Sequence, residues 1–174
     1  MLELLQPKAY ADSVLELPLE ELRRKHISAF IFDLDNTITE WNSHHIDDQM
    51  EAWFVRLLAQ GFQACILSNN GERRIKSVAD RLGIPFIHRA AKPRRRAFRR
   101  ALYIMGVTAS QTAVVGDQVF TDILGGNRAG LYTILVKPIA SREFIGTKIN
   151  RLLEKMVVKR RRGRFRGQES GESR

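Results

Sequence analysis

The chain has 174 residues, of which 44% are hydrophobic and 28% charged, and its formal net charge is +10. This length and composition suit one globular domain with a substantial core and exclude wholesale disorder. The longest apolar runs are strand-sized, so we expect no membrane-spanning segment, and the N-terminus lacks the basic start and apolar run of a secretory signal. The single Cys65 lies in an apolar run and is interpreted as a buried thiol in a reducing cytoplasm.

The positive charge is concentrated near the C-terminus. Residues 155–174 contain eight Lys/Arg and two Asp/Glu, a net charge of +6, which leaves +4 for residues 1–154. Such a balance suits an anionic partner, which includes nucleic acid, an acidic membrane surface and a phosphorylated substrate. We predict an extension over residues 1–28 that packs on the outside of a domain over 29–158, and a disordered basic tail over 159–174.

An apolar, β-prone run over 29–32 ends abruptly at Asp33-Leu34-Asp35-Asn36-Thr37. Side chains alternate along a strand, so Asp33 and Asp35 start on the same side, with Leu34 turned away. Two carboxylates this close repel each other unless a cation lies between them, which favours a divalent metal. A strand followed by an ordinary Asp/Asn turn explains the same residues if they are taken alone.

Helix-like and strand-like segments alternate along the rest of the domain. The predicted helices are 47–60, 72–82, 92–105 and 121–128, each ending at a glycine; the further predicted strands are 62–67, 85–88, 112–115 and 131–136. This alternation predicts a single Rossmann-like, three-layer α/β domain with a five-stranded, mainly parallel sheet.

Polar side chains follow three of these strands. Asp33 and Asp35 follow the first strand, Ser68 follows the second, and Asp117 follows the strand over 112–115. Ligands of parallel α/β sheets bind beyond the carboxyl ends of the strands, so we expect these side chains to meet at one site.

Four motifs in this order resemble the haloacid dehalogenase (HAD) superfamily of phosphatases. They are Asp33-Leu34-Asp35-Asn36-Thr37, Ser68-Asn69-Asn70, Lys92-Pro93 and Gly116-Asp117-Gln118-Val119-Phe120-Thr121-Asp122. Together with the glycine-rich segment 125–130, they resemble most the capless phosphatases of subfamily IIIA, the YqeG-type branch related to phosphatidylglycerophosphate phosphatases. The short intervals between the motifs also leave no room for an inserted cap domain, so we expect an open site.

The resemblance implies a role for each matched residue. Asp33 is implied as the nucleophile that forms an aspartyl-phosphate, and Asp35 as the group that protonates the leaving oxygen and later activates water. Ser68 is implied to hydrogen-bond the phosphoryl group, and Lys92 to pair with its charge. The implied Mg²⁺ ligands are Asp33, Asp35 (through its carbonyl) and Asp117, with Thr37 and Asp122 in support and with Asn69, Asn70 and Arg94 binding substrate.

Elementary chemistry agrees with these roles. A carboxylate nucleophile divides one difficult hydrolysis into two easier steps. Several carboxylates would repel a phosphate dianion, so Mg²⁺ and Lys92 are needed to reverse the local charge.

Basic residues crowd the expected open edge of the site. They are Arg73, Arg74, Lys76, Arg94, Arg95, Arg96, Arg99 and Arg100. They fit either a solvated helix face or recognition of a second phosphate or an anionic surface. In the loop after the nucleophile, Trp41 is a candidate for substrate contact, whereas His44 and His45 are interpreted as ordinary exposed residues.

The sequence therefore predicts a cytoplasmic, Mg²⁺-dependent phosphatase that acts on a phosphomonoester. By resemblance only, the favoured substrate is phosphatidylglycerophosphate, whose lipid headgroup would bring the protein to the inner membrane surface. The alternatives are another phosphoester and an RNA- or ribosome-binding module. Apolar residues at helical spacing over 144–156 fit a helix docked on the domain or a membrane-surface helix, and the basic tail fits RNA as well as anionic lipid. The oligomeric state is left open.

Overall fold

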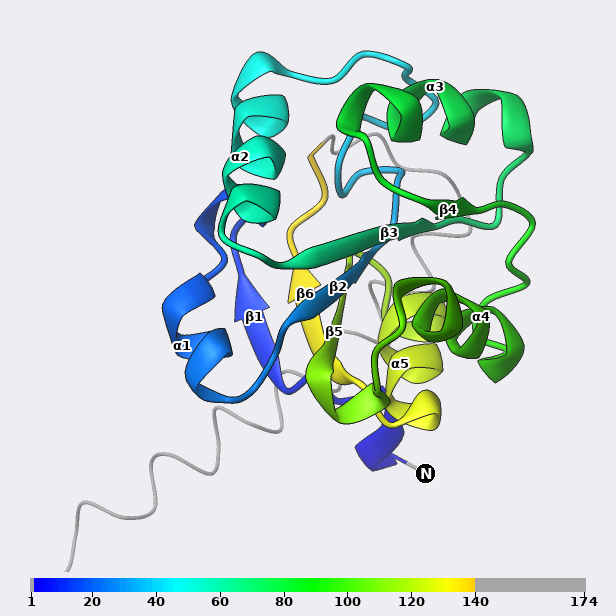
Figure 1. The fold of residues 1–174 in the computed structure, drawn as a ribbon. Helices are drawn as coiled ribbons and strands as arrows, with labels where there is room; N and C mark the ends of the chain where they lie inside the picture. The colour runs from blue at the N-terminus through cyan, green and yellow to red at the C-terminus, as the bar shows by residue number, and fades with distance from the viewer. Residues whose placement is uncertain (1, 140–174) are drawn as a thin grey trace, which may run out of the picture.

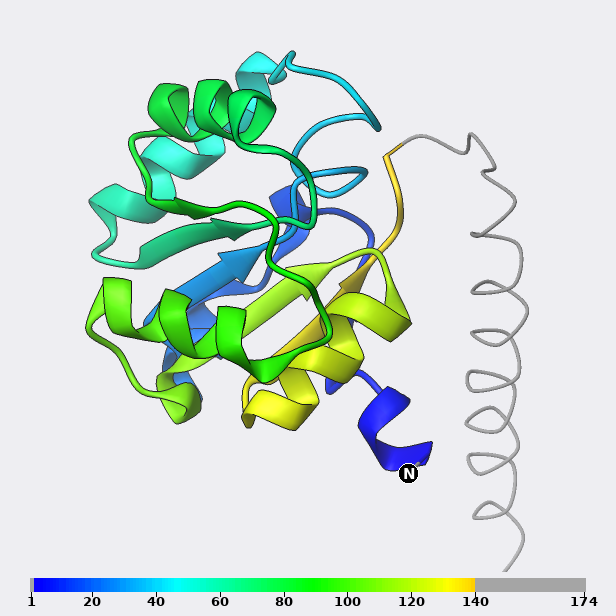
Figure 2. The same ribbon diagram turned by 90° about the vertical axis from the view of Figure 1, so that its right-hand side faces the viewer.

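A parallel sheet of six strands lies between two layers of helices (Figures 1 and 2). The computed structural model describes residues 2–139. The strand order is β1-β6-β5-β2-β3-β4. The strands are β1 (Ala9–Ala11), β2 (Ala29–Phe32), β3 (Gln63–Leu67), β4 (Phe86–Ile87), β5 (Thr112–Gly116) and β6 (Tyr132–Val136). The α/β fold with a parallel sheet is therefore confirmed, while the helix predicted near 144–156 and the tail lie outside the described residues.

The prediction of five strands was wrong, because the N-terminal segment contributes β1. This strand pairs in parallel with β6, with Tyr10 opposite Leu135. Its three residues, Ala-Tyr-Ala, are too short for an alternating pattern to stand out in the sequence. The segment before residue 29 therefore extends the central sheet in addition to packing against it.

The helices follow the predicted order, with corrections at their starts. They are α1 (Leu19–Arg24), α2 (Asp48–Ala59), α3 (Glu72–Leu82), α4 (Arg95–Met105) and α5 (Leu124–Ala129), with short turns η1 (Leu2–Leu5), η2 (Val14–Glu16), η3 (Ala109–Gln111) and the π-helical η4 (Val119–Ile123). Helix α4 begins after Lys92-Pro93 and not at it, because Lys92 and Pro93 belong to the loop that enters the site. The helix predicted over 121–128 is divided between η4 and α5.

Each face of the sheet carries its own apolar core. On one face, α2 packs an aromatic cluster against β2, in which the Phe32 ring lies 5.0 Å from that of Phe54 and 6.0 Å from that of Trp53. On the other face, α4 buries Phe98 completely, among residues that include Val114 of β5. Figure 2 shows the two helix layers on opposite sides of the sheet.

The sheet order brings three polar strand ends together. Strand β2 lies between β3 and β5, and all three run parallel. Within residues 2–139, β2 and β3 are each followed by a single helix before the next strand, with no inserted cap domain. No helix in this range is both long and apolar enough to cross a membrane.

Candidate active site

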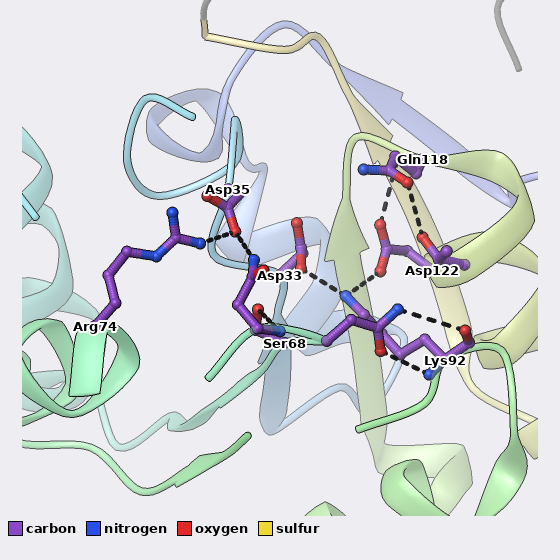
Figure 3. A network of polar contacts seen from close by, with 10 residues as sticks. Asp33, Asp35, Ser68, Arg74, Lys92, Gln118 and Asp122 are labelled. Carbon is purple, nitrogen blue, oxygen red and sulfur yellow. Dashed lines mark hydrogen bonds and ion pairs between the residues drawn. The ribbon is translucent and has the colours of Figure 1, made fainter. Parts of the chain in front are cut away.

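The centre of the candidate site is Lys92, which is buried and joins two acidic side chains. Its Nζ donates to Asp33 Oδ1 at 2.5 Å and to Asp122 Oδ1 at 2.6 Å (Figure 3). Burial alone would lower the pKa of Lys92, but the charges of Asp122 and Asp33 outweigh it and raise that pKa above its ordinary value. Lys92 therefore stays protonated and places a fixed positive charge next to Asp33.

Asp33 is held at the end of β2 by the sheet itself. Its backbone N–H donates to the Val115 carbonyl at 2.9 Å, which continues the pairing of β2 with β5. Burial raises the pKa of the Asp33 carboxyl to about 7, against the opposing charge of Lys92 and with the support of Asp122. The side chain is thus a buried carboxylate with a single fixed counter-charge beside it.

A third carboxylate completes a cluster around this pair. Asp33, Asp117 and Asp122 each offer an oxygen, and these oxygens all lie within 4.8 Å of one another. Burial and the charge of Asp33 raise the pKa of Asp117 to about 8, and within residues 2–139 its buried Oδ1 has no hydrogen-bond partner. Lys92 offsets only part of this negative charge, so the cluster fits a divalent cation.

Close packing places Asp122 in the cluster. A Cβ atom on Gly116 would lie 2.4 Å from the Asp122 carboxyl carbon, so only glycine allows this approach at the end of β5. The Gln118 backbone N–H also donates to Asp122 Oδ2 at 3.3 Å. Asp122, predicted in a supporting role, thus lies within the carboxylate cluster itself, while a metal bond from the Asp35 carbonyl stays a prediction.

The Asp35 side chain points away from this cluster and contacts a second set of groups. Its Oδ2 accepts hydrogen bonds from the Arg74 guanidinium and the Asn70 amide (Figure 3). Its Oδ1 accepts from the Asn42 backbone N–H at 3.1 Å, and Arg74 also donates to the Asn42 side chain at 3.1 Å. The carboxyl is therefore fixed between the loop after β2 and the first turns of α3.

The other predicted residues divide into those near the centre and one at the surface. Ser68 is buried at the end of β3, where its hydroxyl accepts from the Asn70 backbone N–H at 3.2 Å. Asn69 accepts from the Lys92 backbone N–H at 2.8 Å, so it positions the loop that carries the lysine. The Thr37 hydroxyl is buried without a hydrogen bond to the described residues, and Arg94 is exposed next to α4. Their substrate or supporting roles stay predictions.

A pocket of about 760 Å³ opens on the Asp35 side of the centre. Its lining comes from the loop after β2 and the start of α3: Trp41, Asn42, His44, Asn70, Gly71, Glu72, Arg73, Arg74 and Ser77. This lining has two arginines, Arg73 and Arg74, against a single acid, Glu72. The pocket therefore suits a ligand rich in oxygen atoms.

Comparisons with known proteins agree with this geometry. A family model described as HAD-hydrolase-like matches residues 89–140. The chain is also 38% identical over 165 residues to the probable phosphatase YqeG of Bacillus subtilis strain 168, covering 94% of this chain and 96% of that protein. The chain belongs to the HAD superfamily. It is a phosphoric monoester hydrolase of the YqeG type, as the four motifs predicted.

More distant relatives extend this HAD assignment. The chain is 33% identical over 153 residues to phosphatidylglycerophosphate phosphatase 1, chloroplastic/mitochondrial, of Arabidopsis thaliana, covering 81% of this chain and 43% of that protein. A cobalt-bound deoxy-D-mannose-octulosonate 8-phosphate phosphatase from Haemophilus influenzae superposes with a TM-score of 0.55 at 19% identity, over 78% of this chain and 89% of that one. At this identity the second comparison shows the shared fold alone.

One residue of this HAD site escaped the sequence analysis. Arg74 was grouped with the other basic residues of its segment, yet its side chain is mostly buried against Asp35. The sequence signal that could have singled out Arg74 is its position in the first turns of the helix that follows Ser68-Asn69-Asn70. Of the three residues considered in the loop after β2, Trp41 and His44 line the pocket, whereas His45 is not part of the lining.

Proposed function

We propose that this protein is an Mg²⁺-dependent phosphatase that acts through an aspartyl-phosphate on Asp33, with phosphatidylglycerophosphate as its substrate. The observation that carries the proposal is the buried cluster of Asp33, Asp117 and Asp122 beside Lys92, with one Asp117 oxygen lacking a partner among the described residues. Buried carboxylates without compensation are unfavourable, which indicates that the cluster is built to hold a cation.

Asp33, Asp117 and Asp122 are the side chains that would hold the metal. Mg²⁺ prefers a few carboxylates together with water and substrate oxygens, which this group leaves room for. When bound, the metal would neutralise charge on the phosphoryl group. Lys92 supplies the same kind of stabilisation from the protein, because its ammonium already lies next to the nucleophile.

The residues of the chain provide the remaining steps. The Asp33 carboxylate attacks phosphorus, the bond from phosphorus to the ester oxygen breaks, and Asp35 gives its proton to that oxygen. Water then attacks the phosphoryl group while Asp35 accepts its proton, which releases phosphate and restores Asp33. Ser68, buried beside Asp33 at the strand ends, is the proposed hydrogen-bonding partner of the phosphoryl oxygens.

Three contacts prepare Asp35 for this role. Arg74, Asn70 and the Asn42 N–H all bind its carboxyl, which therefore has one orientation toward the pocket side of the centre. The leaving group of the substrate would consequently lie in the pocket that Arg73, Arg74 and Trp41 line.

Two observations support a lipid-linked substrate. The Arabidopsis relative is named as a phosphatidylglycerophosphate phosphatase, and the chain aligns with it over 81% of its own length. The site of this protein also lacks a cap within residues 2–139, so a large leaving group can enter the pocket. The arginines of the pocket suit the second phosphate of such a leaving group.

A panel of phosphoesters tests both the proposed mechanism and the proposed substrate. Purified protein with Mg²⁺ is assayed for phosphate release from phosphatidylglycerophosphate in detergent, glycerol 3-phosphate and p-nitrophenyl phosphate. Asp33→Asn should abolish release from all of them and EDTA should do so reversibly, whereas Asp48→Asn, at an exposed helix position, should leave activity unchanged.

The outcomes separate mechanism from substrate. Full activity of Asp33→Asn would overturn the aspartyl-phosphate mechanism. Turnover of the soluble esters without turnover of phosphatidylglycerophosphate would keep the mechanism and overturn the substrate.

A further inference from the structure

We infer that helix α4 docks this protein on an anionic lipid surface through an exposed row of arginines. This α4 arginine face consists of Arg95, Arg96, Arg99 and Arg100, all of them exposed. Helix α4 lies in the helix layer on one face of the sheet (Figure 2), and its buried residues, which include Phe98 and Ala101, belong to the core on that face. The proposal goes beyond the catalytic site, because none of these residues belongs to it.

The arginines of this face have no partners among residues 2–139. None of their side chains forms an ion pair or a hydrogen bond with a described residue, in contrast to basic residues on the opposite helix layer. There, Lys25 pairs with Glu21, Lys76 with Asp80, and Arg81 with Glu51. Helix α4 contains no acidic residue at all. The positive charge of the α4 arginine face is thus directed entirely outward.

This charge pattern opposes the stability of the helix that carries it. Arg95 and Arg99, and likewise Arg96 and Arg100, are like charges at i,i+4 spacing, which destabilise a helix. Arginines in the first turn also oppose the helix dipole, whereas α2 and α3 carry acids there, as is usual. An arrangement that is unfavourable within the domain is explained by a function outside it, namely attraction to an anionic partner.

Two exposed apolar side chains make a lipid surface the partner that fits best. Tyr103 is 87% exposed and Ile104 is 42% exposed, and both follow the arginines on α4. Helices that lie on membranes combine a basic face with aromatic and aliphatic side chains that enter the headgroup region. The inner side of α4 is anchored by Phe98 and Met105 in the core, so the outward face is presented rigidly.

Docking through α4 would keep the candidate site at the lipid surface. Helix α4 begins directly after the loop that carries Lys92, so its first arginines are the part of the face nearest the site. This last step rests on the proposed lipid-linked substrate. The binding itself does not, and can be measured without any turnover.

Vesicle binding by charge variants tests the inference. Full-length protein is used throughout, so that the basic C-terminal residues are common to all samples. Arg95→Gln/Arg99→Gln is compared with a control of equal charge loss on the opposite helix layer, Arg24→Gln/Arg56→Gln, whose residues are also exposed. Binding to vesicles of phosphatidylglycerol and phosphatidylcholine is measured by sedimentation at about 0.1 M salt, with thermal denaturation as a check on folding.

The expected result is a loss specific to α4. Each arginine near an anionic bilayer contributes about fivefold to partitioning, so the α4 pair should bind roughly 25-fold more weakly, and the control less than about threefold. Both differences should shrink at about 0.5 M salt. Hydrolysis of p-nitrophenyl phosphate should be unchanged in both variants, which separates this inference from the proposed function.

Three outcomes would overturn the inference. Intact protein that does not bind the anionic vesicles would exclude lipid as the partner. Equal losses in the two variants would mean that net charge, and not the α4 arginine face, is responsible. If the α4 pair loses binding to a single-stranded RNA at matched salt while keeping vesicle binding, the face serves a nucleic acid instead.

Discussion

Replacing Asp117 by asparagine should stabilise the metal-free protein at pH 8, although it removes a residue of the proposed metal site. The pKa of Asp117 is raised from 3.8 to about 8, chiefly by burial. Between these values the unfolded chain has released a proton that the folded protein still holds. Stability present below pH 3.8 is therefore lost as the pH rises toward 8, and an asparagine cannot lose it in this way.

The size of the effect follows from the same shift. A rise from 3.8 to about 8, at about 1.4 kcal/mol per pKa unit, sets a ceiling of about 6 kcal/mol on the stability that ionisation of Asp117 costs the folded protein. Part of the shift comes from the charges of Asp33 and Asp122, and it falls when the cluster relaxes. We therefore expect a gain of about 2 kcal/mol, seen as a rise in Tm of about 6 °C.

Thermal denaturation in EDTA and in Mg²⁺, at pH 5.5 and pH 8, measures the difference in Tm between Asp117→Asn and the wild type. In EDTA the variant should exceed the wild type at both pH values, and by more at pH 8, because at pH 5.5 less than half of this stability has been lost. In Mg²⁺ the order should reverse, because the metal binds the ionised carboxylates of the folded wild type and releases their protons. Asp80→Asn, at an exposed ion pair outside the cluster, serves as the control. A Tm of Asp117→Asn below that of the wild type by the same amount at both pH values would refute the reasoning.

Two further substitutions test the arrangement around the centre. Asp35→Asn should reduce hydrolysis of alkyl phosphates about tenfold more than hydrolysis of p-nitrophenyl phosphate, because the better leaving group needs less protonation; equal losses in kcat would assign Asp35 to positioning alone. Gly126→Ala should lower the free energy of unfolding by about 2 kcal/mol, since its Cβ would lie 2.3 Å from Val114 Cγ1, whereas Gly71→Ala meets no atom within 4 Å and should change it by less than about 1 kcal/mol in urea titrations.

The meeting of Asp33, Ser68 and Asp117 at one edge of the sheet could be predicted from the sequence because these residues lie at the ends of strongly marked strands. The continuous apolar run of β2 and the abrupt change to Asp33 fix both the strand and the place where it ends. Ser68 and Asp117 follow strands of the same kind, and a parallel sheet brings such ends together whatever the intervening helices contain. Local pattern and topology pointed to the same edge.

Side-chain partners could not be predicted in the same way, because they depend on distances between distant segments. Asp33 and Asp35 follow the same strand, yet one carboxyl faces Lys92 and the other faces Arg74. Alternation along a strand predicted that both acids face one metal. The alternation no longer applies once the strand has ended, so it could not separate the two carboxyls. The close approach of Asp122 likewise depends on the missing side chain of Gly116, which only the packed structure makes visible.

The N-terminal strand β1 was not predicted from the sequence, and we expect its removal to destabilise the domain. Strand β1 covers the edge of β6, and its support comes from several places. The Lys8 backbone N–H donates to the Thr133 carbonyl at 2.9 Å, and its Nζ donates to the Leu131 carbonyl at 2.8 Å. The Asn127 side-chain amide also donates to the carbonyls of Leu4 and Gln6, which precede β1. Deleting residues 1–12 therefore removes a whole ladder of hydrogen bonds from the sheet.

This deletion should lower the free energy of unfolding by at least about 4 kcal/mol, at about 1 kcal/mol for each of the four hydrogen bonds named, and the Tm by about 12 °C. It should also promote association, because β6 would become an exposed edge that can pair with another chain. Light scattering together with thermal denaturation measures both effects, and deletion of residues 159–174 is the control, for which we expect no change in Tm. A truncated protein that keeps the Tm and the light scattering of the wild type would mean that the sheet needs only five strands, as the sequence suggested, and that β1 merely rests on its edge.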